Sequence, residues 1–278
     1  MSASGHAGRE GRVNSVAKAT KILGTFTPLV RVLSLRQIVR RTGIPRSTAH
    51  GLCVTLCDAG LLEEVPHRGY QLGSALVALG CQVMDRTGLV EAARGQLERP
   101  VRRDGTEAHL AQLVGGWVVY LDRRTSRHGA PMNNRVGMRA PAHRTGCGKA
   151  ALSRLREEDV ASRVQQTCAA DHVEVPDFAR LHEELARARK RGYVVNVDFQ
   201  PGRVSVAAPV LDAHQVIVGG VSVAGPAKLF DATSVEQAAA DIVAVATAIS
   251  ERIGLRGAYA PPPNPTRPTK KVPLAGPS

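Results

Sequence analysis

The chain has 278 residues, 43% of them hydrophobic, which is enough for two modest domains or one large one. Its 37 lysines and arginines outnumber the 24 acidic residues and give a formal net charge of +13. Such a surplus favours a polyanionic partner without choosing between nucleic acid and a membrane surface. No apolar run approaches the ~20 residues that a membrane helix requires, so the composition argues against a transmembrane protein.

The cysteines are odd in number, scattered and without a C-x-x-C pair. They are Cys53, Cys57, Cys81, Cys147 and Cys168. Since no signal-peptide pattern opens the chain, we expect reduced thiols and a cytoplasmic location. Cys53 and Cys57 lie one helical turn apart, but no histidine or cysteine pair nearby completes a metal site. We therefore expect both to be packing residues, and we expect no metal or cofactor.

Positive charge is concentrated near the start of the chain. Between residues 9 and 57 nine basic residues are opposed only by Glu10, whereas residues 86–255 are close to balance. This distribution is typical of a DNA-binding module that carries a second domain. Residues 1–12 are small, polar and rich in glycine and serine, and we expect a disordered arm. Residues 256–278 are basic and proline-rich, and we expect a disordered tail.

Helical signals fill residues 13–60. The first helix is expected over residues 15–26. Ser34, with Gln37 three residues later, has the capping-box pattern of a second helix, which Gly43 is placed to end. Pro45 suits the first turn of a third helix. In that helix apolar residues recur at helical spacing and predict one buried face, formed by Ala49, Leu52, Cys53 and Leu56.

Two helices joined by a short glycine-containing turn, the second with a basic and polar outer face, form a helix-turn-helix. Residues 61–72 follow as a hairpin with residues 66–69 at its tip, the position of a wing. The sequence therefore predicts a winged helix-turn-helix domain over residues 13–73. Residues 74–87 are expected to form a linker helix, whose apolar stripe packs either on its own domain or on a partner subunit.

The remainder mixes strands and helices. Residues 108–114 and 117–122 predict a hairpin across Gly115 and Gly116. Residues 193–197, 203–211 and 215–224 are further strands, and residues 148–155, 178–191 and 234–253 are helices. Strands that arrive as hairpins with helices between them predict an antiparallel α+β domain over residues 88–255.

Short fragments recur in a characteristic order and spacing along the chain. They are residues 15–19, 42–48, 70–73, 146–150, 201–210 and 222–226. Together they resemble the isocitrate-lyase-regulator (IclR) type of bacterial transcriptional regulators over roughly residues 13–255. The resemblance implies a GAF-like effector-binding domain, homodimers or homotetramers, and control of a catabolic or secondary-metabolic operon. Many relatives carry an acidic residue before the Pro-Gly turn, where this chain has Asn196 and, nearby, Asp198.

The DNA-binding residues are expected on the two helices of the helix-turn-helix and on the wing. Arg46, Ser47 and His50 lie early in the recognition helix, and Arg46 is suited to bidentate pairing with guanine. Arg68 at the wing tip is expected to reach a phosphate or the minor groove. The full candidate set is Arg36, Arg40, Arg41, Arg46, Ser47, Thr48, His50 and Arg68. For any one of them taken alone, a solvated helix face is the simpler interpretation.

The resemblance also implies an effector pocket at the turn into the Gly148 helix, facing the strands of Ser205 and Ser222. Its candidate residues are Gly146, Cys147, Gly148, Asn196, Ser205 and Ser222. Backbone N–H groups at a helix N-terminus favour an anion, so a small organic acid is the expected effector; a plain glycine turn is an equal alternative. The same N-terminus would lower the pKa of the Cys147 thiol, although packing is its simpler role.

No catalytic residue is expected, because the chain has no G-x-S-x-G, H-E-x-x-H or dinucleotide fingerprint. A phosphate-binding P-loop is excluded, since Ala150 replaces the required Ser or Thr. The expected function is a ligand-responsive regulator of transcription, more readily a repressor than an activator, with double-stranded operator DNA as partner. A DNA-tethered enzyme acting on a small acid, and a basic protein whose winged module contacts other proteins, stay as alternatives.

Overall fold

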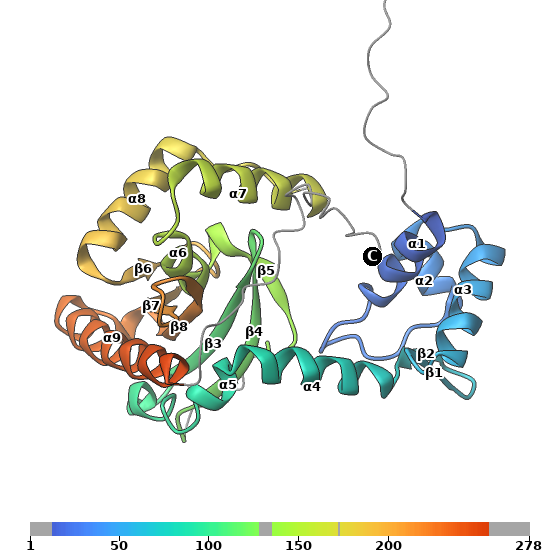
Figure 1. The fold of residues 1–278 in the computed structure, drawn as a ribbon, viewed down its shortest axis with the longest axis horizontal. Coiled ribbons are helices and arrows are strands. Elements are labelled where there is room, and N and C mark those ends of the chain that lie inside the picture. The colour runs from blue at the N-terminus through green and yellow to red at the C-terminus, as the bar shows by residue number, and fades with distance from the viewer. Residues whose placement is uncertain (1–12, 128–134, 172, 256–278) are drawn as a thin grey trace, which may run out of the picture. The chain divides into compact units, whose positions relative to one another are not determined.

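The computed structural model describes residues 13–127, 135–171 and 173–255. Its internal contacts divide the chain into two units, one ending at Asp85 and one beginning at Arg86. Figure 1 traces the elements of both units in chain order. The arm expected over residues 1–12 and the tail expected over residues 256–278 lie outside the described residues.

The first unit contains the predicted helix-turn-helix and wing. Its elements are α1 (Asn14–Leu23), α2 (Leu35–Thr42), α3 (Arg46–Asp58), β1 (Leu62–Val65) and β2 (Gly69–Leu72). The capping box is confirmed: the Ser34 hydroxyl accepts from the Gln37 N–H, and the Gln37 side chain accepts from the Ser34 N–H at 2.8 Å. Gly43 ends α2 at φ 69°, a conformation that glycine adopts without strain. Pro45 precedes α3 as its N-cap instead of entering its first turn.

The wing is fixed to the helices by backbone pairing. Leu33, which lies just before α2, exchanges two backbone hydrogen bonds of 2.9 Å with Tyr70 in β2. At Gly69 a Cβ would lie 2.3 Å from the Leu33 carbonyl oxygen, so this close approach requires glycine. The core beneath combines buried side chains of all three helices and the wing, among them Ile22, Leu33, Ile38, Ala49, Cys53, Leu56 and Leu62. This pairing and packing support the hairpin turn that carries Arg68.

The helix α4 (Ala75–Thr87), in the region of the expected linker helix of residues 74–87, crosses from the first unit into the second. The second unit then contains α5 (Leu89–Ala92), β3 (Glu107–Val114), β4 (Trp117–Thr125), β5 (Arg139–Pro141), α6 (Gly146–Leu152), α7 (Glu157–Asp171), α8 (Phe178–Arg191), β6 (Val194–Asn196), β7 (Arg203–Leu211), β8 (Ile217–Pro226) and α9 (Ala232–Gly254). Short 3₁₀ turns occur at Arg99–Val101, Ala142–Arg144 and Ala227–Leu229.

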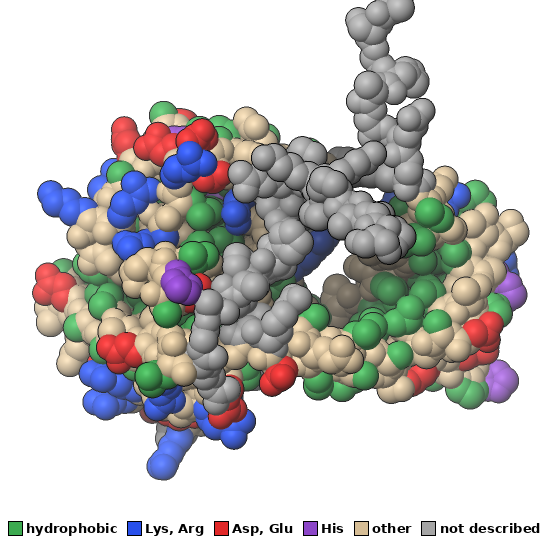
Figure 2. All heavy atoms as spheres, in the orientation of Figure 1, with side chains coloured by type: hydrophobic (Ala, Val, Ile, Leu, Met, Phe, Trp, Pro, Cys, Tyr) green, Lys and Arg blue, Asp and Glu red, His purple; other side chains and the backbone are tan. Residues whose placement is uncertain are grey.

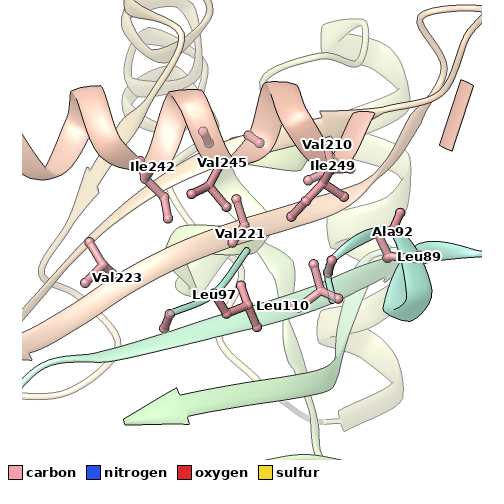
Figure 3. Packing of buried hydrophobic residues seen from close by; sticks show 14 of the residues in the cluster. Leu89, Ala92, Leu97, Leu110, Val210, Val221, Val223, Ile242, Val245 and Ile249 are labelled. Atoms are coloured by element: carbon pink, nitrogen blue, oxygen red, sulfur yellow. The ribbon is translucent and has the colours of Figure 1, made fainter. Parts of the chain in front are cut away.

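One antiparallel sheet organises the second unit, with the strand order β5-β4-β3-β8-β7-β6. Because side chains alternate across a strand, its two faces build two cores. One core packs α9 against β3, β7 and β8, and Figure 3 shows Ile242, Val245 and Ile249 of the helix with Val210, Val221 and Leu110 of the strands. The other packs α6, α7 and α8 on the opposite face. The predicted α+β class with an antiparallel sheet is confirmed.

Two helices differ from the prediction. The helix expected from residue 148 begins two residues earlier, at Gly146, because the Thr145 hydroxyl accepts from the Gly148 N–H and caps it. Helix α7 was not predicted, although Val160, Val164 and Cys168 recur every fourth residue and are buried. By contrast, α8 and β7 have the predicted bounds, and Gly192 ends α8 in the left-handed conformation.

Candidate functional site

The outer face of α3 is polar and the inner face is apolar. Arg46, Ser47 and His50 are exposed and Thr48 is half-buried, whereas Ala49 and Cys53 are buried against the core. Arg36 and Arg40 are exposed on α2, and Arg68 is exposed at the tip of the wing. Arg41 donates one hydrogen bond to the Thr25 carbonyl at 3.0 Å, so part of its guanidinium serves the fold. A helix that turns an arginine and short polar side chains outward is suited to read base edges in a major groove.

The second unit contains a cavity formed on two rungs of the sheet that lie two residues apart and so share one face. In one rung Glu107, Ala224, Ser205 and Asn196 stand opposite each other on β3, β8, β7 and β6. Two residues further along β3, His109 stands opposite Ser222. Directly paired residues of an antiparallel sheet point to the same face, so both rungs face the cavity.

Helix α6 covers these rungs with its first turn. Thr145, Gly146 and Cys147 line the cavity, and the Cys147 thiol donates to the Ser222 hydroxyl at 3.2 Å. Gly148 is not among the lining residues: a Cβ there would lie 2.2 Å from the Ala142 carbonyl oxygen, so this glycine allows α6 to pack on the preceding turn. The structure therefore brings five of the six candidate effector residues to one cavity, namely Gly146, Cys147, Asn196, Ser205 and Ser222.

A buried ion cluster contributes Glu107 and Arg203 to the lining of the cavity. Glu107 is 3% exposed and accepts from Arg203 at 2.9 Å and from Arg123 at 3.0 Å. The His109 Nε2 lies 3.7 Å from the same carboxylate. Burial, reinforced by the positive charges of Arg135, Arg123 and Arg203, lowers the pKa of His109 to about 3. His109 is therefore a neutral side chain near neutral pH, and its contact with Glu107 is not an ion pair.

The Cys147 thiol differs from the expectation for a helix N-terminus. Burial raises its pKa to about 11, an effect larger than the lowering by its hydrogen bond to Ser222 and by the charge of Arg135. A thiol with a raised pKa is a poor nucleophile at neutral pH. The structure thus supports packing and hydrogen bonding, not redox reactivity, as the role of Cys147.

Two buried polar atoms of the cavity lack a hydrogen-bond partner among the described residues. They are the His109 Nε2 and the Asn196 Oδ1. The Asn196 amide nitrogen donates to the Arg144 carbonyl at 3.2 Å, which leaves the amide oxygen directed elsewhere. Since an unsatisfied buried polar atom costs about 1–3 kcal/mol, a ligand or water that supplies the missing partner gains affinity here.

The lining of this cavity includes a half-buried cation, Arg135. The Arg135 guanidinium lies 4.5 Å from the centre of the Phe199 ring and 5.8 Å from that of Tyr120, and it donates a hydrogen bond to the Tyr120 hydroxyl. Across residues 13–127, 135–171 and 173–255, no carboxylate forms an ion pair with it. The cavity volume is about 30 Å³, so in this structure the space is narrow and a ligand larger than water needs some of these side chains to move.

Sequence reasoning missed part of this lining. Glu107 and His109 could have been predicted as lining residues, because polar residues two positions apart on an apolar strand share one face. Arg135 and Phe199 could not, since both belong to irregular segments far apart in the sequence. Among the described residues, no group of three or more His, Cys, Asp or Glu side chains is arranged to hold a metal ion. Every described helix is too short or too polar to cross a membrane.

Comparison with known proteins agrees with these two units. Residues 15–66 match the "IclR helix-turn-helix domain", and residues 81–251 match "Bacterial transcriptional regulator IclR C-terminal". The chain is 31% identical over 198 residues to the HTH-type transcriptional regulator BhcR of Paracoccus denitrificans, covering 70% of this chain and 71% of the relative. It is 26% identical over 222 residues to the transcriptional repressor IclR of Escherichia coli, covering 78% and 81%.

A solved structure extends the comparison to the fold. It is an IclR homologue of Microbacterium hydrocarbonoxydans in complex with 4-hydroxybenzoate, with a TM-score of 0.70 and 24% identity, covering 86% of this chain and 98% of the other. The matched relatives are regulators of transcription and not enzymes. The helix-turn-helix, the curled antiparallel sheet domain and these matches together show that the chain belongs to the IclR family of bacterial transcriptional regulators.

Proposed function

We propose that the chain is a ligand-responsive regulator whose effector is a small organic anion, bound in the cavity between α6 and the sheet. The observation that carries this proposal is Arg135, a half-buried cation of the lining without a carboxylate partner among the described residues. A carboxylate that enters the cavity would supply that partner, and charge-assisted hydrogen bonds to arginine are among the strongest in proteins.

The other lining groups narrow the chemistry of the effector. The acceptor oxygen of Asn196 calls for a hydrogen-bond donor, and the rings of Tyr120 and Phe199 provide apolar surface. A carboxylate that also carries a hydroxyl group meets both demands. The complex of the Microbacterium hydrocarbonoxydans homologue with 4-hydroxybenzoate, an acid of this type, supports that class.

The DNA-binding residues of this proposal are Arg46, Ser47, Thr48 and His50 on α3, with Arg36, Arg40 and Arg41 on α2 and Arg68 on the wing as phosphate contacts. We propose a winged domain over residues 13–73, a linker helix over residues 74–87 and a GAF-like effector domain over residues 88–255. Val77, Leu79 and Val83 of α4 are exposed apolar side chains, and Figure 2 shows hydrophobic surface along this helix. They favour pairing with a second copy, as a dimer or tetramer.

Control of transcription then follows from linkage. An effector changes operator affinity only by binding more tightly to one arrangement of the dimer than to the other. We propose repression of a catabolic or secondary-metabolic operon in the cytoplasm, with the effector releasing the operator. The name of the Escherichia coli relative, transcriptional repressor IclR, supports repression.

The test combines two measurements on the full chain. Calorimetry against a panel of neutral, cationic and anionic metabolites is expected to detect only anions, and hydroxylated carboxylates most strongly. Arg135→Gln should weaken that binding about tenfold or more, because a charge-assisted hydrogen bond is lost. Arg139→Gln is the matched control, since its guanidinium stacks on Trp117 and is not part of the cavity lining. Binding of neutral or cationic compounds alone would refute the proposal.

A further inference from the structure

A buried lysine lies on α6, two residues after Cys147 of the cavity lining. The Lys149 side chain is 3% exposed, and its ammonium lies 2.9 Å from the Glu184 carboxylate and 2.5 Å from that of Asp198. A buried ammonium needs such partners, because an unpaired charge away from water is strongly unfavourable. The three residues are far apart in the sequence, so the ion cluster connects separate segments of the second unit.

The two carboxylates belong to segments with different relations to the cavity. Asp198 precedes Phe199 and Gln200, which form one wall of the cavity. Lys149 follows Gly146 and Cys147 on α6, which form another wall. Glu184 is on α8, which contributes no residue to the lining. The bond from Lys149 to Asp198 therefore joins the two walls, whereas the bond to Glu184 does not.

We propose that Lys149 and Asp198 are positioning residues of the effector site: their ion pair holds the wall of residues 198–200 against α6 and sets how readily the cavity opens. This inference rests on the proposed function, in that the cavity is taken as the effector site.

Burial and charge make the pair suited to opening and closing. Lys149 stays buried beside Glu184 when Asp198 leaves, so its ammonium keeps one partner and the fold keeps its charge balance. The Asp198 side chain is 50% exposed, so water can replace Lys149 as its partner at small cost. Arg144 and Arg180 add positive charge around Asp198 and favour the closed position.

The wall of residues 198–200 also contacts Arg135, the cation proposed to bind the effector. The Phe199 ring stacks on the guanidinium of Arg135 at 4.5 Å. Release of Asp198 would therefore loosen the aromatic side of the cavity together with the group proposed to bind the effector carboxylate. In the narrow cavity of this structure, such a movement is what admits a ligand.

Cys147 provides a probe of opening that needs no effector. Its thiol lines the cavity and is 2% exposed, so a thiol reagent reaches it only when the cavity opens. The exposed Cys81 and half-buried Cys57 are first replaced by serine. The rate of modification by N-ethylmaleimide is then measured for each remaining cysteine by mass spectrometry of proteolytic fragments. Cys168, which is buried in α7 away from the cavity, reports general loosening of the unit.

Two matched variants separate a positioning role from a structural one. Asp198→Asn and Glu184→Gln each remove one carboxylate from Lys149, but only the first frees the wall. We expect Asp198→Asn to raise the modification rate of Cys147 about three- to fivefold, the scale of a partly exposed ion pair, without a change at Cys168. Glu184→Gln should change the Cys147 rate less than about twofold, and Asp198→Glu should restore slow modification.

Equal acceleration of Cys147 by both variants, or no acceleration by Asp198→Asn, would overturn the proposal. So would parallel acceleration at Cys168, which indicates general destabilisation. If Asp198→Asn does not fold, the Lys149–Asp198 ion pair is tested in the protein with both residues unchanged, by raising KCl from about 0.1 to 1 M. A Cys147 rate that rises with salt while the Cys168 rate stays constant then supports the proposal, and an unchanged Cys147 rate contradicts it. Since no effector is added, failure here is distinct from failure of the metabolite screen.

Discussion

Gly146 and Ser205 face each other so closely in the proposed effector cavity that a Cβ on the glycine would lie 2.6 Å from the Ser205 Oγ. The next nearest atom, the Cβ of Ala207, would lie at 3.3 Å. A side chain at residue 146 therefore has to displace the serine hydroxyl and occupy cavity space. The absence of a Cβ at this position keeps the cavity open between α6 and β7.

From this relationship we predict that Gly146→Ala folds but loses affinity for the effector about tenfold. The Ser205 hydroxyl can rotate away, which spares the fold, but the added methyl group then intrudes on the ligand, and such overpacking costs about 1–3 kcal/mol. Calorimetry with the best anion of the screen measures the loss. Gly148→Ala is the contrasting control, because its Cβ would meet the backbone of Ala142 at 2.2 Å and should lower the melting temperature instead. Unchanged affinity in a folded Gly146→Ala protein would contradict this view of the cavity.

A second prediction concerns base recognition by α3. Arg46→Ala should strongly reduce the preference for operator DNA over scrambled DNA, since a bidentate arginine–guanine pair contributes about 1–3 kcal/mol of discrimination. Fluorescence anisotropy with DNA from the region upstream of the gene provides the measurement. Effector affinity and the melting temperature should stay constant, because Arg46 is exposed. Arg156→Ala, which removes an exposed arginine of the second unit, controls for loss of charge; retained operator preference in Arg46→Ala would refute the assignment.

A phosphate contact has a different signature from a base contact. Arg40 is exposed on α2, and Arg40→Ala should weaken binding to operator and scrambled DNA alike. The slope of log affinity against log salt should fall in magnitude by about 0.9, the value for one neutralised phosphate. Anisotropy titrations over a salt series give both quantities. A changed sequence preference with an unchanged slope would instead identify Arg40 as a base reader.

Local sequence signals predicted the elements whose ends are fixed by neighbouring residues. The capping box of Ser34 and Gln37 and the ending glycines Gly43 and Gly192 are such signals, because cap hydrogen bonds and left-handed backbone depend on residues close in the chain. The start of α6 was misplaced because Gly146 and Gly148 read as a turn. Both glycines instead allow close tertiary packing, since the absence of a Cβ makes room beside Ser205 at Gly146 and beside Ala142 at Gly148.

The same distinction applies to the site. The small residues around the cavity followed from the resemblance to a family, and the polar alternation of Glu107 and His109 was available in the sequence. The contact of Arg135 with Phe199 and the bond of Lys149 to Asp198 connect segments 64 and 49 residues apart, respectively, and no local pattern indicates such pairs. These two contacts form because β6, β7 and α6 come together in space, and the order of the strands in the sheet determines that arrangement.

The last prediction is a loss of stability in mild acid. Burial lowers the pKa of His109 to about 3 and that of His143 to about 4, so both stay neutral in the folded chain well below the ordinary histidine value of about 6.5. Below that value the unfolded chain binds protons at these residues and the folded chain does not, so protonation favours unfolding and stability falls as the pH decreases. Each histidine should lower the free energy of unfolding by about 1.4 kcal/mol per pH unit as the pH falls from about 6 to its folded pKa.

Urea unfolding followed by Trp117 fluorescence isolates the second unit, since this is the one tryptophan of the chain. We expect the free energy of unfolding to fall steadily from about pH 6 to pH 4.5, and His143→Gln to make that fall less steep by about 1.4 kcal/mol per pH unit. His214→Gln, in the exposed turn between β7 and β8, should leave the slope as it is. A slope that both variants leave intact would mean that His143 gains its proton in the folded chain as readily as in the unfolded one, and the neutral, buried state described here would be wrong.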